Sequence, residues 1–380
     1  MEKEALELKH GLISVDDHVQ EVPDLWTSRL DASRWGERIP HIERAPDGSE
    51  RWVADGTMLM GGRLADAGAL MDDRNDEPKT WAEVPAAAHD PAERLKAMDA
   101  AGVDYSALYP TVAGLAGHAF GSIEDPDLEL ACVQAYNDWL SEEWAGTSSR
   151  FIPQCIVPIS SPEATVREIH RSVEKGHRGV VYPAMPMYLR DVPHVNGPEY
   201  DQVWEACAGL GVPLCLHAGA SSLLQYPPYE GLAPTLAAAL DEVTRPVSSV
   251  FVISGLTFSR ILLRHPELRV VLAESALGWG LLYLEWADHQ FEHDGLAAEG
   301  YDLTPSEMFR RQCYFNAWFD PIARWAPHIG TEHILWSTNL PLATSTWPKT
   351  KETVERCFDG VSAEGREQVL WRNAASLFHL

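Results

Sequence analysis

Several polar residues stand where apolar runs end, and their types would suit metal or acid/base chemistry. Two histidines and a carboxylate form a ligand set typical of divalent zinc, manganese or iron. A lone histidine is more often a hydrogen-bonded structural residue, so the prediction depends on the fold bringing the residues together. The residues in question are Asp16, His18, Tyr182, His217, Glu274 and Asn339.

Short β-rich runs that precede these residues predict the strands that would position them. Residues two apart on a strand point to the same face, so Asp16 and His18 are expected to share one. Eight strands are predicted, at Leu12–Val19, Tyr105–Pro110, Phe151–Ile159, Gly179–Pro183, Pro213–His217, Arg269–Glu274, Cys313–Trp318 and His333–Ser337.

Helical patterns alternate with the strands, which favours a parallel (β/α)₈ barrel of the α/β class. The competing fold, a doubly wound open sheet, usually has fewer units and often a glycine-rich loop after its first strand; here that strand continues into Asp16, Asp17 and His18. Barrel active sites lie at the carboxyl ends of the strands, where the polar residues stand. The helices are predicted at Pro91–Ala101, Asp127–Trp144, Pro162–Lys175, Glu199–Leu210, Val250–Arg264, Gly280–Phe291, Pro321–Ala326, Lys349–Phe358 and Ser362–Phe378.

Residues 20–89 do not follow this alternation. They are rich in Gly, Asp and Pro, and Arg51 to Asp55 resembles part of a small hairpin. We interpret them as an insertion at the barrel rim that helps to cover a pocket. Since a barrel can accommodate all 380 residues, we expect one domain spanning 1–380.

The charge of the chain limits its partners. Lys and Arg number 30 against 56 Asp and Glu, which gives a formal net charge of −26. Such an anion is repelled by nucleic acid and by acidic membrane surfaces, so a small-molecule substrate is expected. No apolar run approaches the roughly 20 residues that span a bilayer, and the charged N-terminus does not resemble a secretory signal. A cytoplasmic location is therefore expected.

The sequence resembles the amidohydrolase superfamily, in particular the amidohydrolase-2 branch that includes aminocarboxymuconate semialdehyde and γ-resorcylate decarboxylases. The resemblance covers nearly the whole chain. It rests on ISVDDHVQEVPDLW (Ile13 to Trp26), AYNDWLSEEW (Ala135 to Trp144), RFIPQCIVPISSPE (Arg150 to Glu163), GHRGVVYPAMP (Gly176 to Pro186), WEACAGLGVPLCLHAG (Trp204 to Gly219), LRVVLAESALGWG (Leu268 to Gly280), FRRQCY (Phe309 to Tyr314) and VLWRNAASLF (Val369 to Phe378).

This resemblance implies a barrel with one divalent metal, and dimers are common among such relatives. It assigns the metal to Asp16, His18 and His217, together with a final-strand aspartate that also moves protons. Glu274 falls where other branches place a histidine near the substrate. His289, in WADHQF, matches a recurring Asp-His pair and is expected to reach the pocket from its helix.

The final strand departs from the family pattern. The chain reads STNLPLATSTWP, so Asn339 stands in place of the metal-binding aspartate, while Leu342 and Thr344 replace a histidine and a second aspartate. An amide oxygen is a weaker ligand than a carboxylate and cannot act as a general base. A site with zinc, manganese or iron and a site without metal both remain open.

Aromatic residues beside these motifs predict a pocket for a planar substrate. Trp26, Trp279 and Trp318 lie close to the motif residues in sequence, and Tyr182 lies on a predicted strand. By base rate most tryptophans pack in cores. We assign these four residues to substrate binding.

Three functions are weighed. The first is an amidohydrolase-type decarboxylase or hydrolase of a small carboxylated or acyl-bearing, aromatic molecule, in which Glu274 or His289 handles the proton beside His217 and Asn339. The second is a metal-independent lyase, cyclase or isomerase that uses Asp16, His18, His217 and Glu274 as an acid/base cluster. The third, a non-catalytic binding protein, is disfavoured because erosion would not spare buried polar residues.

Overall fold

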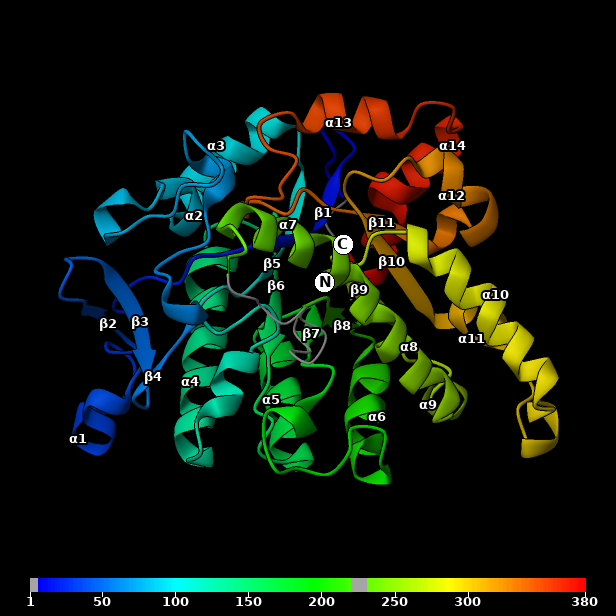
Figure 1. Ribbon diagram of the computed structural model, residues 1–380, viewed down its shortest axis with the longest axis horizontal. Coiled ribbons are helices and arrows are strands. Elements are labelled where there is room, and N and C mark those ends of the chain that lie inside the picture. Colours follow the sequence, from blue (N-terminus) through cyan, green and yellow to red (C-terminus); the bar gives the residue numbers. More distant parts are fainter. Residues whose placement is uncertain (1–5, 220–230) are drawn as a thin grey trace.

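Eight parallel strands form a nearly closed barrel in the computed structural model, which describes residues 6–219 and 231–380 (Figure 1). Every predicted strand is present, and the α/β barrel is confirmed. Their order around the barrel follows the chain: β1 (Ile13–His18), β5 (Tyr105–Tyr109), β6 (Phe151–Ile156), β7 (Gly179–Val181), β8 (Leu214–His217), β9 (Val270–Ala273), β10 (Cys313–Ala317) and β11 (Ile334–Trp336).

The barrel closes between β1 and the residues that follow β11. There the His18 amide donates to the Leu340 carbonyl at 2.7 Å, and the Asn339 amide donates to the Asp16 carbonyl at 3.0 Å. On the other side of β1, the register with β5 shifts between Ser14 and Asp17, the mark of a bulge. The bulge in β1 therefore lies at Val15 and Asp16, and Asp16 is one of the predicted metal ligands.

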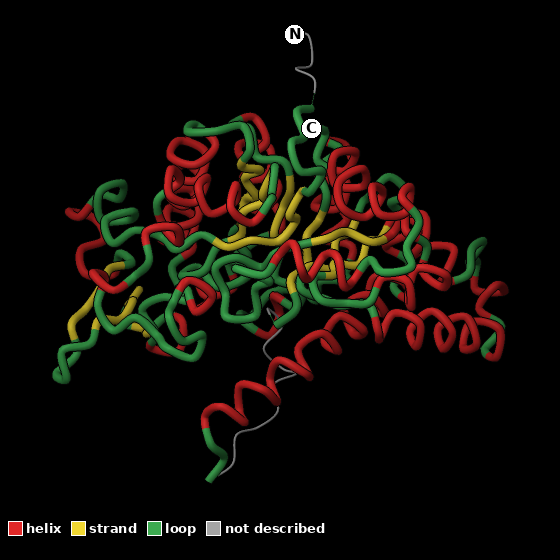
Figure 2. Tube along the Cα trace, turned by 90° about the horizontal axis from the view of Figure 1, so that it is seen from above, coloured by secondary structure: helices red, strands yellow, loops and turns green. Residues whose placement is uncertain are grey.

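Helices surround the strands (Figures 1 and 2). Two of the longer ones begin at capping residues. The Asp125 carboxylate accepts from the amides of Asp127 and Leu128, and the Ser161 hydroxyl accepts from the amide of Ala164. The described helices of the barrel are α3 (Pro91–Ala101), α4 (Pro126–Trp139), α5 (Pro162–Glu174), α6 (Asp201–Leu210), α7 (Pro234–Thr244), α8 (Ser248–Phe258), α9 (Ile261–Arg264), α10 (Gly278–His293), α11 (Pro305–Gln312), α12 (Ile322–Ile329), α13 (Thr350–Cys357), α14 (Ala363–Glu367) and α15 (Asn373–Leu377).

Three helical segments differ from the prediction. Residues 250–264 do not form one helix, because Arg260 has a left-handed backbone, φ 63°, that separates α8 from α9. Two helices, α7 and α11, were not predicted. In α7, Leu236 and Val243 are exposed, so its apolar residues do not mark a single buried face. This helix lies in front of the barrel in Figure 1 and stands out from it in Figure 2.

The insertion forms a three-stranded antiparallel sheet, which contains the hairpin predicted around Arg51 to Asp55. Its elements are α1 (Ala32–Trp35), β2 (His41–Arg44), β3 (Glu50–Ala54), β4 (Thr57–Met58) and α2 (Ala86–His89). The buried guanidinium of Arg94 donates to the carbonyls of Ala87 and His18, at 2.6 and 2.8 Å. Arg94 therefore ties the end of the insertion to the end of β1.

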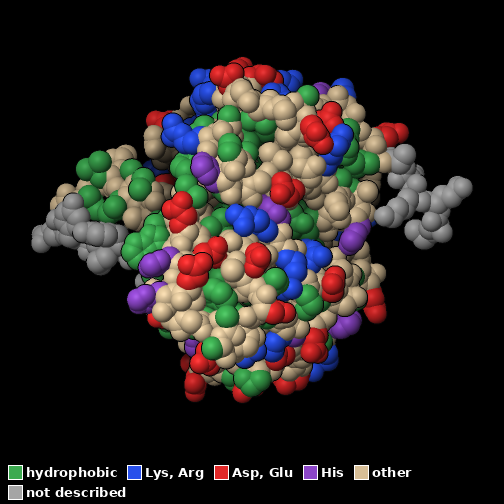
Figure 3. Space-filling view, turned by 90° about the vertical axis from the view of Figure 1, so that its right-hand side faces the viewer, with side chains coloured by type: hydrophobic (Ala, Val, Ile, Leu, Met, Phe, Trp, Pro, Cys, Tyr) green, Lys and Arg blue, Asp and Glu red, His purple; other side chains and the backbone are tan. Residues whose placement is uncertain are grey.

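The surface shown in Figure 3 carries acidic and basic side chains interspersed over the drawn face. Among the described residues, no helix combines the length and the apolar character that crossing a bilayer requires.

Candidate metal centre and active site

The side chains of Asp16, His18 and His217 converge at the end of the barrel where β1 and β8 finish. Asp16 Oδ1 lies 3.5 Å from His18 Nε2 and 3.6 Å from His217 Nε2, and the two Nε2 atoms are 3.3 Å apart. All three side chains are inaccessible to solvent. We call them the triad.

Backbone carbonyls orient both imidazole rings of the triad. His18 Nδ1 lies 2.8 Å from the Pro110 carbonyl oxygen, and His217 Nδ1 lies 2.7 Å from that of Ala218. A carbonyl oxygen only accepts, so each Nδ1 carries the proton, and in the neutral rings each Nε2 presents a lone pair. Metal-binding histidines are commonly oriented in this way.

The triad fits a divalent cation. Neither carboxylate oxygen of Asp16 accepts a hydrogen bond from any residue that the structure describes, although both are buried. Burial also lowers the pKa of His18, which favours the neutral ring. For His217 burial acts in the same direction, but the neighbouring Asp16 raises its pKa above the ordinary value. The buried, unpartnered carboxylate that faces the two imidazoles needs a positive charge, which a divalent cation would supply.

Glu274 and Asn339 lie beside the triad and bind each other. Asn339 Nδ2 donates to Glu274 Oε1 at 2.9 Å and to the Thr344 hydroxyl at 2.8 Å, and Glu274 Oε2 is 3.7 Å from His217 Nδ1. Both residues have left-handed backbones, φ 50° and 57°, directly after β9 and near the end of β11. Such conformations are uncommon outside glycine and often mark functional sites. The Oδ1 atom of Asn339 is buried and, within 6–219 and 231–380, without a partner.

Arg245 brings a partly buried positive charge to Glu274. Its guanidinium lies 3.3 Å from Glu274, 2.8 Å from Asp241 and 2.7 Å from Glu242. Burial opposes this charge, yet the three carboxylates raise the pKa of Arg245 above its ordinary value. Arg245 therefore stays charged.

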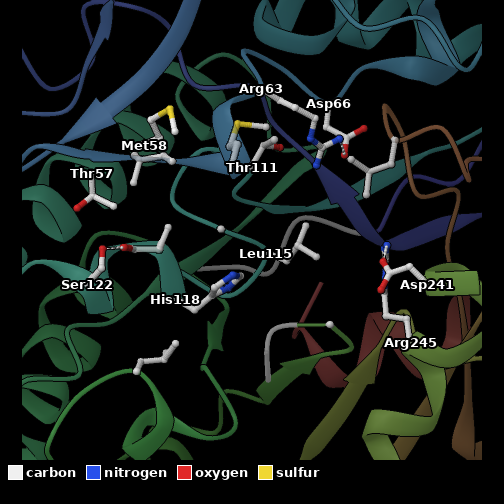
Figure 4. A pocket seen from close by; sticks show the side chains of 18 of the residues that line it. Thr57, Met58, Arg63, Asp66, Thr111, Leu115, His118, Ser122, Asp241 and Arg245 are labelled. Carbon is white, nitrogen blue, oxygen red and sulfur yellow. Dashed lines mark hydrogen bonds and ion pairs between the residues drawn. The ribbon is translucent and has the colours of Figure 1, made fainter. Parts of the chain in front are cut away.

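A cavity of about 660 Å³, which we call the rim cavity, lies between the insertion and the barrel (Figure 4). The insertion contributes Met58, Arg63 and Asp66 to its lining, and the loop after β5 contributes His118. The insertion therefore forms one wall of a pocket at the barrel mouth. Burial lowers the pKa of His118 to about 4, so this imidazole is neutral at physiological pH.

A second cavity of about 510 Å³, the side cavity, lies between the C-terminal end of α7 and the start of α10. Its lining includes Glu274, Arg245, Trp279 and Trp318. Of the described residues, Arg245 alone lines both cavities. The Glu274–Arg245 pair thus stands between the two.

The structure brings five of the predicted site residues together: Asp16, His18, His217, Glu274 and Asn339. It does not bring His289 to them. That side chain is exposed on α10, with its ring centre 5.9 Å from the ring centre of His293.

The four predicted substrate-binding aromatic residues lie in different places. Trp279 and Trp318 line the side cavity. Tyr182 lines a small cavity of about 120 Å³ next to Trp204. Trp26 is fully buried between Trp52 and Phe120, and its Nε1 donates to the Cys132 carbonyl at 3.0 Å, so it packs in the core.

Three residues near the site were missed by the sequence analysis. The Tyr109 ring packs against His18 and His217, with ring centres 5.8 and 5.7 Å away. His118 and Arg245 line the rim cavity. Tyr109 lies near the end of the strand predicted at Tyr105–Pro110 and was detectable on that ground, whereas the other two follow no strand directly.

Comparisons with known proteins agree with this geometry. A sequence model described as amidohydrolase matches residues 35–380. A γ-resorcylate decarboxylase of Polaromonas sp. (strain JS666 / ATCC BAA-500) is 25% identical over 360 residues, which are 86% of this chain and 99% of that protein.

Solved structures show the same fold. An amidohydrolase from Mycobacterium avium subsp. paratuberculosis K-10 superposes with a TM-score of 0.78 at 20% identity, covering 98% of this chain and 100% of the other. A dihydroxybenzoic acid decarboxylase from Polaromonas sp. JS666, with bound manganese and the inhibitor 2-nitroresorcinol, gives a TM-score of 0.63 at 20% identity, covering 98% and 97%.

Proposed function

Because the chain belongs to the amidohydrolase family, we propose that it is a metal-dependent lyase that removes carbon dioxide from a small aromatic acid. The observation that carries this proposal is the triad, in which an unpartnered, buried carboxylate faces two imidazole lone pairs. The relatives support the reaction and the metal, since they include aromatic acid decarboxylases and a manganese-bound structure.

The residues around the triad suit this reaction. A divalent cation held by Asp16, His18 and His217 would supply the positive charge that polarises a carboxylate and a neighbouring oxygen of the substrate. Loss of carbon dioxide breaks the bond between the ring and the carboxyl carbon, and the ring carbon must then take up a proton. Glu274 is titratable, lies against the triad and lines a cavity. We assign the proton transfer to Glu274.

Asn339 holds Glu274 in place. Its amide donates to Glu274 Oε1, and a carboxylate at residue 339 would instead face Glu274 with like charge. The aspartate that the family places on the final strand is therefore replaced here by a neutral donor, and the carboxylate that moves the proton, Glu274, stands directly after β9.

The first experiment measures metal in the purified chain. We expect about one divalent ion per chain by mass spectrometry, and chelation should abolish carbon dioxide release from a panel of hydroxybenzoates. His217→Ala should lose both metal and activity, whereas His170→Ala, an exposed histidine on α5, should keep both. Stoichiometric metal with no release from any aromatic acid, but hydrolysis of acyl or ester derivatives, would replace the lyase by a hydrolase.

A metal-free lyase, cyclase or isomerase is the second candidate. It is favoured by one observation, the neutral Asn339 in place of a family carboxylate, which removes a negative charge from the centre. Asn339→Asp separates the two candidates. If the native chain binds no metal but the variant does, the acid/base cluster of Asp16, His18, His217 and Glu274 would be the working site, and the metal-dependent proposal would be abandoned.

A further inference from the structure

The side cavity has walls suited to a planar apolar group. Trp279 and Trp318 line it together with Phe319, and Val243 and Val247 close it from the α7 side. The Trp318 and Phe319 rings meet edge to face at 4.9 Å, and Trp279 meets Phe315 at 5.1 Å. Such aromatic contacts hold the rings in defined orientations. A volume of about 510 Å³ lies in the ordinary range of small-molecule sites.

Two residues that line this cavity each carry a buried polar atom without a partner. Trp318 Nε1, a donor, and Asp320 Oδ2, an acceptor, make no hydrogen bond to the described part of the chain. Their neighbours are satisfied, since Trp279 Nε1 donates to the Ser275 carbonyl at 2.6 Å and Asp320 Oδ1 accepts from the Leu277 amide at 3.0 Å. Buried polar groups are normally paired, so an unmatched donor and an unmatched acceptor on residues that line one cavity favour a ligand that supplies both partners.

One side of the cavity is lined by Glu274 and Arg245. Glu274 lines it and lies 3.7 Å from His217, while Arg245 lines it and lies 3.3 Å from Glu274. A ligand seated on the aromatic walls would therefore extend from the outer surface to the proton-transferring group. The cavity is joined to the proposed active site and is not an isolated surface hollow.

We propose that the side cavity binds the aryl part of the substrate, and that this part carries a hydroxyl group and is larger than a single benzoate ring. The hydroxyl accepts from Trp318 Nε1 and donates to Asp320 Oδ2. This inference rests on the proposed lyase function and names its substrate class, an extended hydroxyaryl carboxylic acid. Burial raises the pKa of Asp320 to about 6, so at neutral pH its carboxylate is ready to accept that proton donor.

Binding of 2-naphthol to the metal-loaded full chain tests the cavity without involving decarboxylation, because this probe carries no carboxylate. We expect one site by isothermal titration calorimetry. Val247→Asp places a charge on an apolar wall and should weaken binding at least about tenfold. Met58→Asp is the matched control, since Met58 lines the rim cavity and is 53% exposed, against 48% for Val247. Equal loss in both variants, or no binding, would overturn the proposal.

The donor is tested by Trp318→Phe, which keeps an aromatic ring and removes the N–H. Binding should fall about fivefold, the worth of one hydrogen bond. Trp286→Phe, at a 66% exposed residue outside the cavity, should leave it unchanged. If Trp318→Phe has no effect, the cavity does not read the hydroxyl group and the proposal fails.

Turnover links the cavity to the reaction. The two-ring acid 3-hydroxy-2-naphthoate should show a kcat/KM at least about tenfold above that of 2-hydroxybenzoate, and Val247→Asp should remove this preference. Equal turnover of both acids would overturn the assignment of the aryl part. Absence of turnover with intact, variant-sensitive 2-naphthol binding would instead contradict the lyase function, so the two failures are distinguishable.

Discussion

Asp16 and Asp17 are adjacent on β1 and both are buried. Their side chains lie on opposite sides of the strand, and the hydrogen bonds that their carboxylates accept differ. Asp17 accepts from the hydroxyls of Ser106 and Thr338, at 2.5 and 2.6 Å, and from the Leu340 amide at 2.9 Å. Asp16 accepts from none of the described residues. One carboxylate therefore fastens β1 to β5 and to the chain after β11, while the other is left to face two imidazoles.

This difference separates a structural charge from a functional one. Burial raises the pKa of Asp17 above its ordinary value, but its hydrogen bonds and the buried Arg94 offset part of that cost. A buried carboxylate without such partners is strongly unfavourable unless a cation joins it. The two residues are identical in DDH, and the period of two places only Asp16 on the face of His18. Their contacts in the structure then separate the two roles.

The largest expected effect comes from removing the structural carboxylate. Asp17→Ala leaves two hydroxyls and an amide at the barrel seam without their acceptor, so the free energy of unfolding should fall by about 3–5 kcal/mol. Urea denaturation of the metal-free protein measures it. A loss below about 1 kcal/mol would mean that the seam does not depend on Asp17.

A bound metal should stabilise the fold through the Asp16 carboxylate. Manganese at about 100 times its dissociation constant should raise the free energy of unfolding by about 2.7 kcal/mol, because it binds the folded chain alone. Thermal and urea unfolding with manganese or with chelator measure the difference. Asp16→Asn should remove most of it. If the variant is stabilised as much as the native chain, Asp16 is not a ligand.

A third buried carboxylate, Glu21, should make the stability of the fold depend on pH. It accepts from the amides of Thr111, Val112 and Ala113, and burial raises its pKa to about 7. The folded state then holds a proton that the unfolded state releases above about pH 4.5, so this contribution to stability is lost as pH rises toward 7.

Between pH 5 and pH 8 the native chain should lose about 2–3 kcal/mol more than Glu21→Gln does. Urea unfolding at four pH values measures both slopes. Parallel slopes would show that Glu21 titrates as an ordinary exposed carboxyl.

The smallest effect has the opposite sign. In the absence of metal, Asp16→Asn should stabilise the chain by about 1–2 kcal/mol, because a neutral amide replaces an unpartnered charge and can donate to an imidazole lone pair. The measurement is urea unfolding in chelator. Destabilisation by this variant would remove the distinction between the two carboxylates.

Local patterns in the sequence were sufficient for the barrel and for the triad. Each strand is a short apolar run, and the period of two predicted that Asp16 and His18 would meet. Local patterns could not predict contacts between segments that are distant in the sequence. Arg245 reaches Glu274 from the turn that follows α7, and nothing in residues 241–247 reveals that approach.

The substitution at residue 339, after β11, shows the same limit. The sequence shows that a carboxylate is missing at residue 339, but the hydrogen bond from Asn339 to Glu274 depends on how β9 and β11 lie around the barrel. His289 shows the reverse error, because a motif on a helix does not specify which face of that helix meets the barrel, and this side chain is exposed.

The left-handed backbone of Asn339 also bears on how such a site changes over generations. Among residues other than glycine, asparagine and aspartate adopt this conformation most readily, and they have nearly the same shape. Aspartate and asparagine can therefore replace each other at position 339 without a change in the backbone, although the charge changes. Most other residue types would strain the backbone at this position, so few substitutions are tolerated there. Asparagine and aspartate can replace each other in either direction.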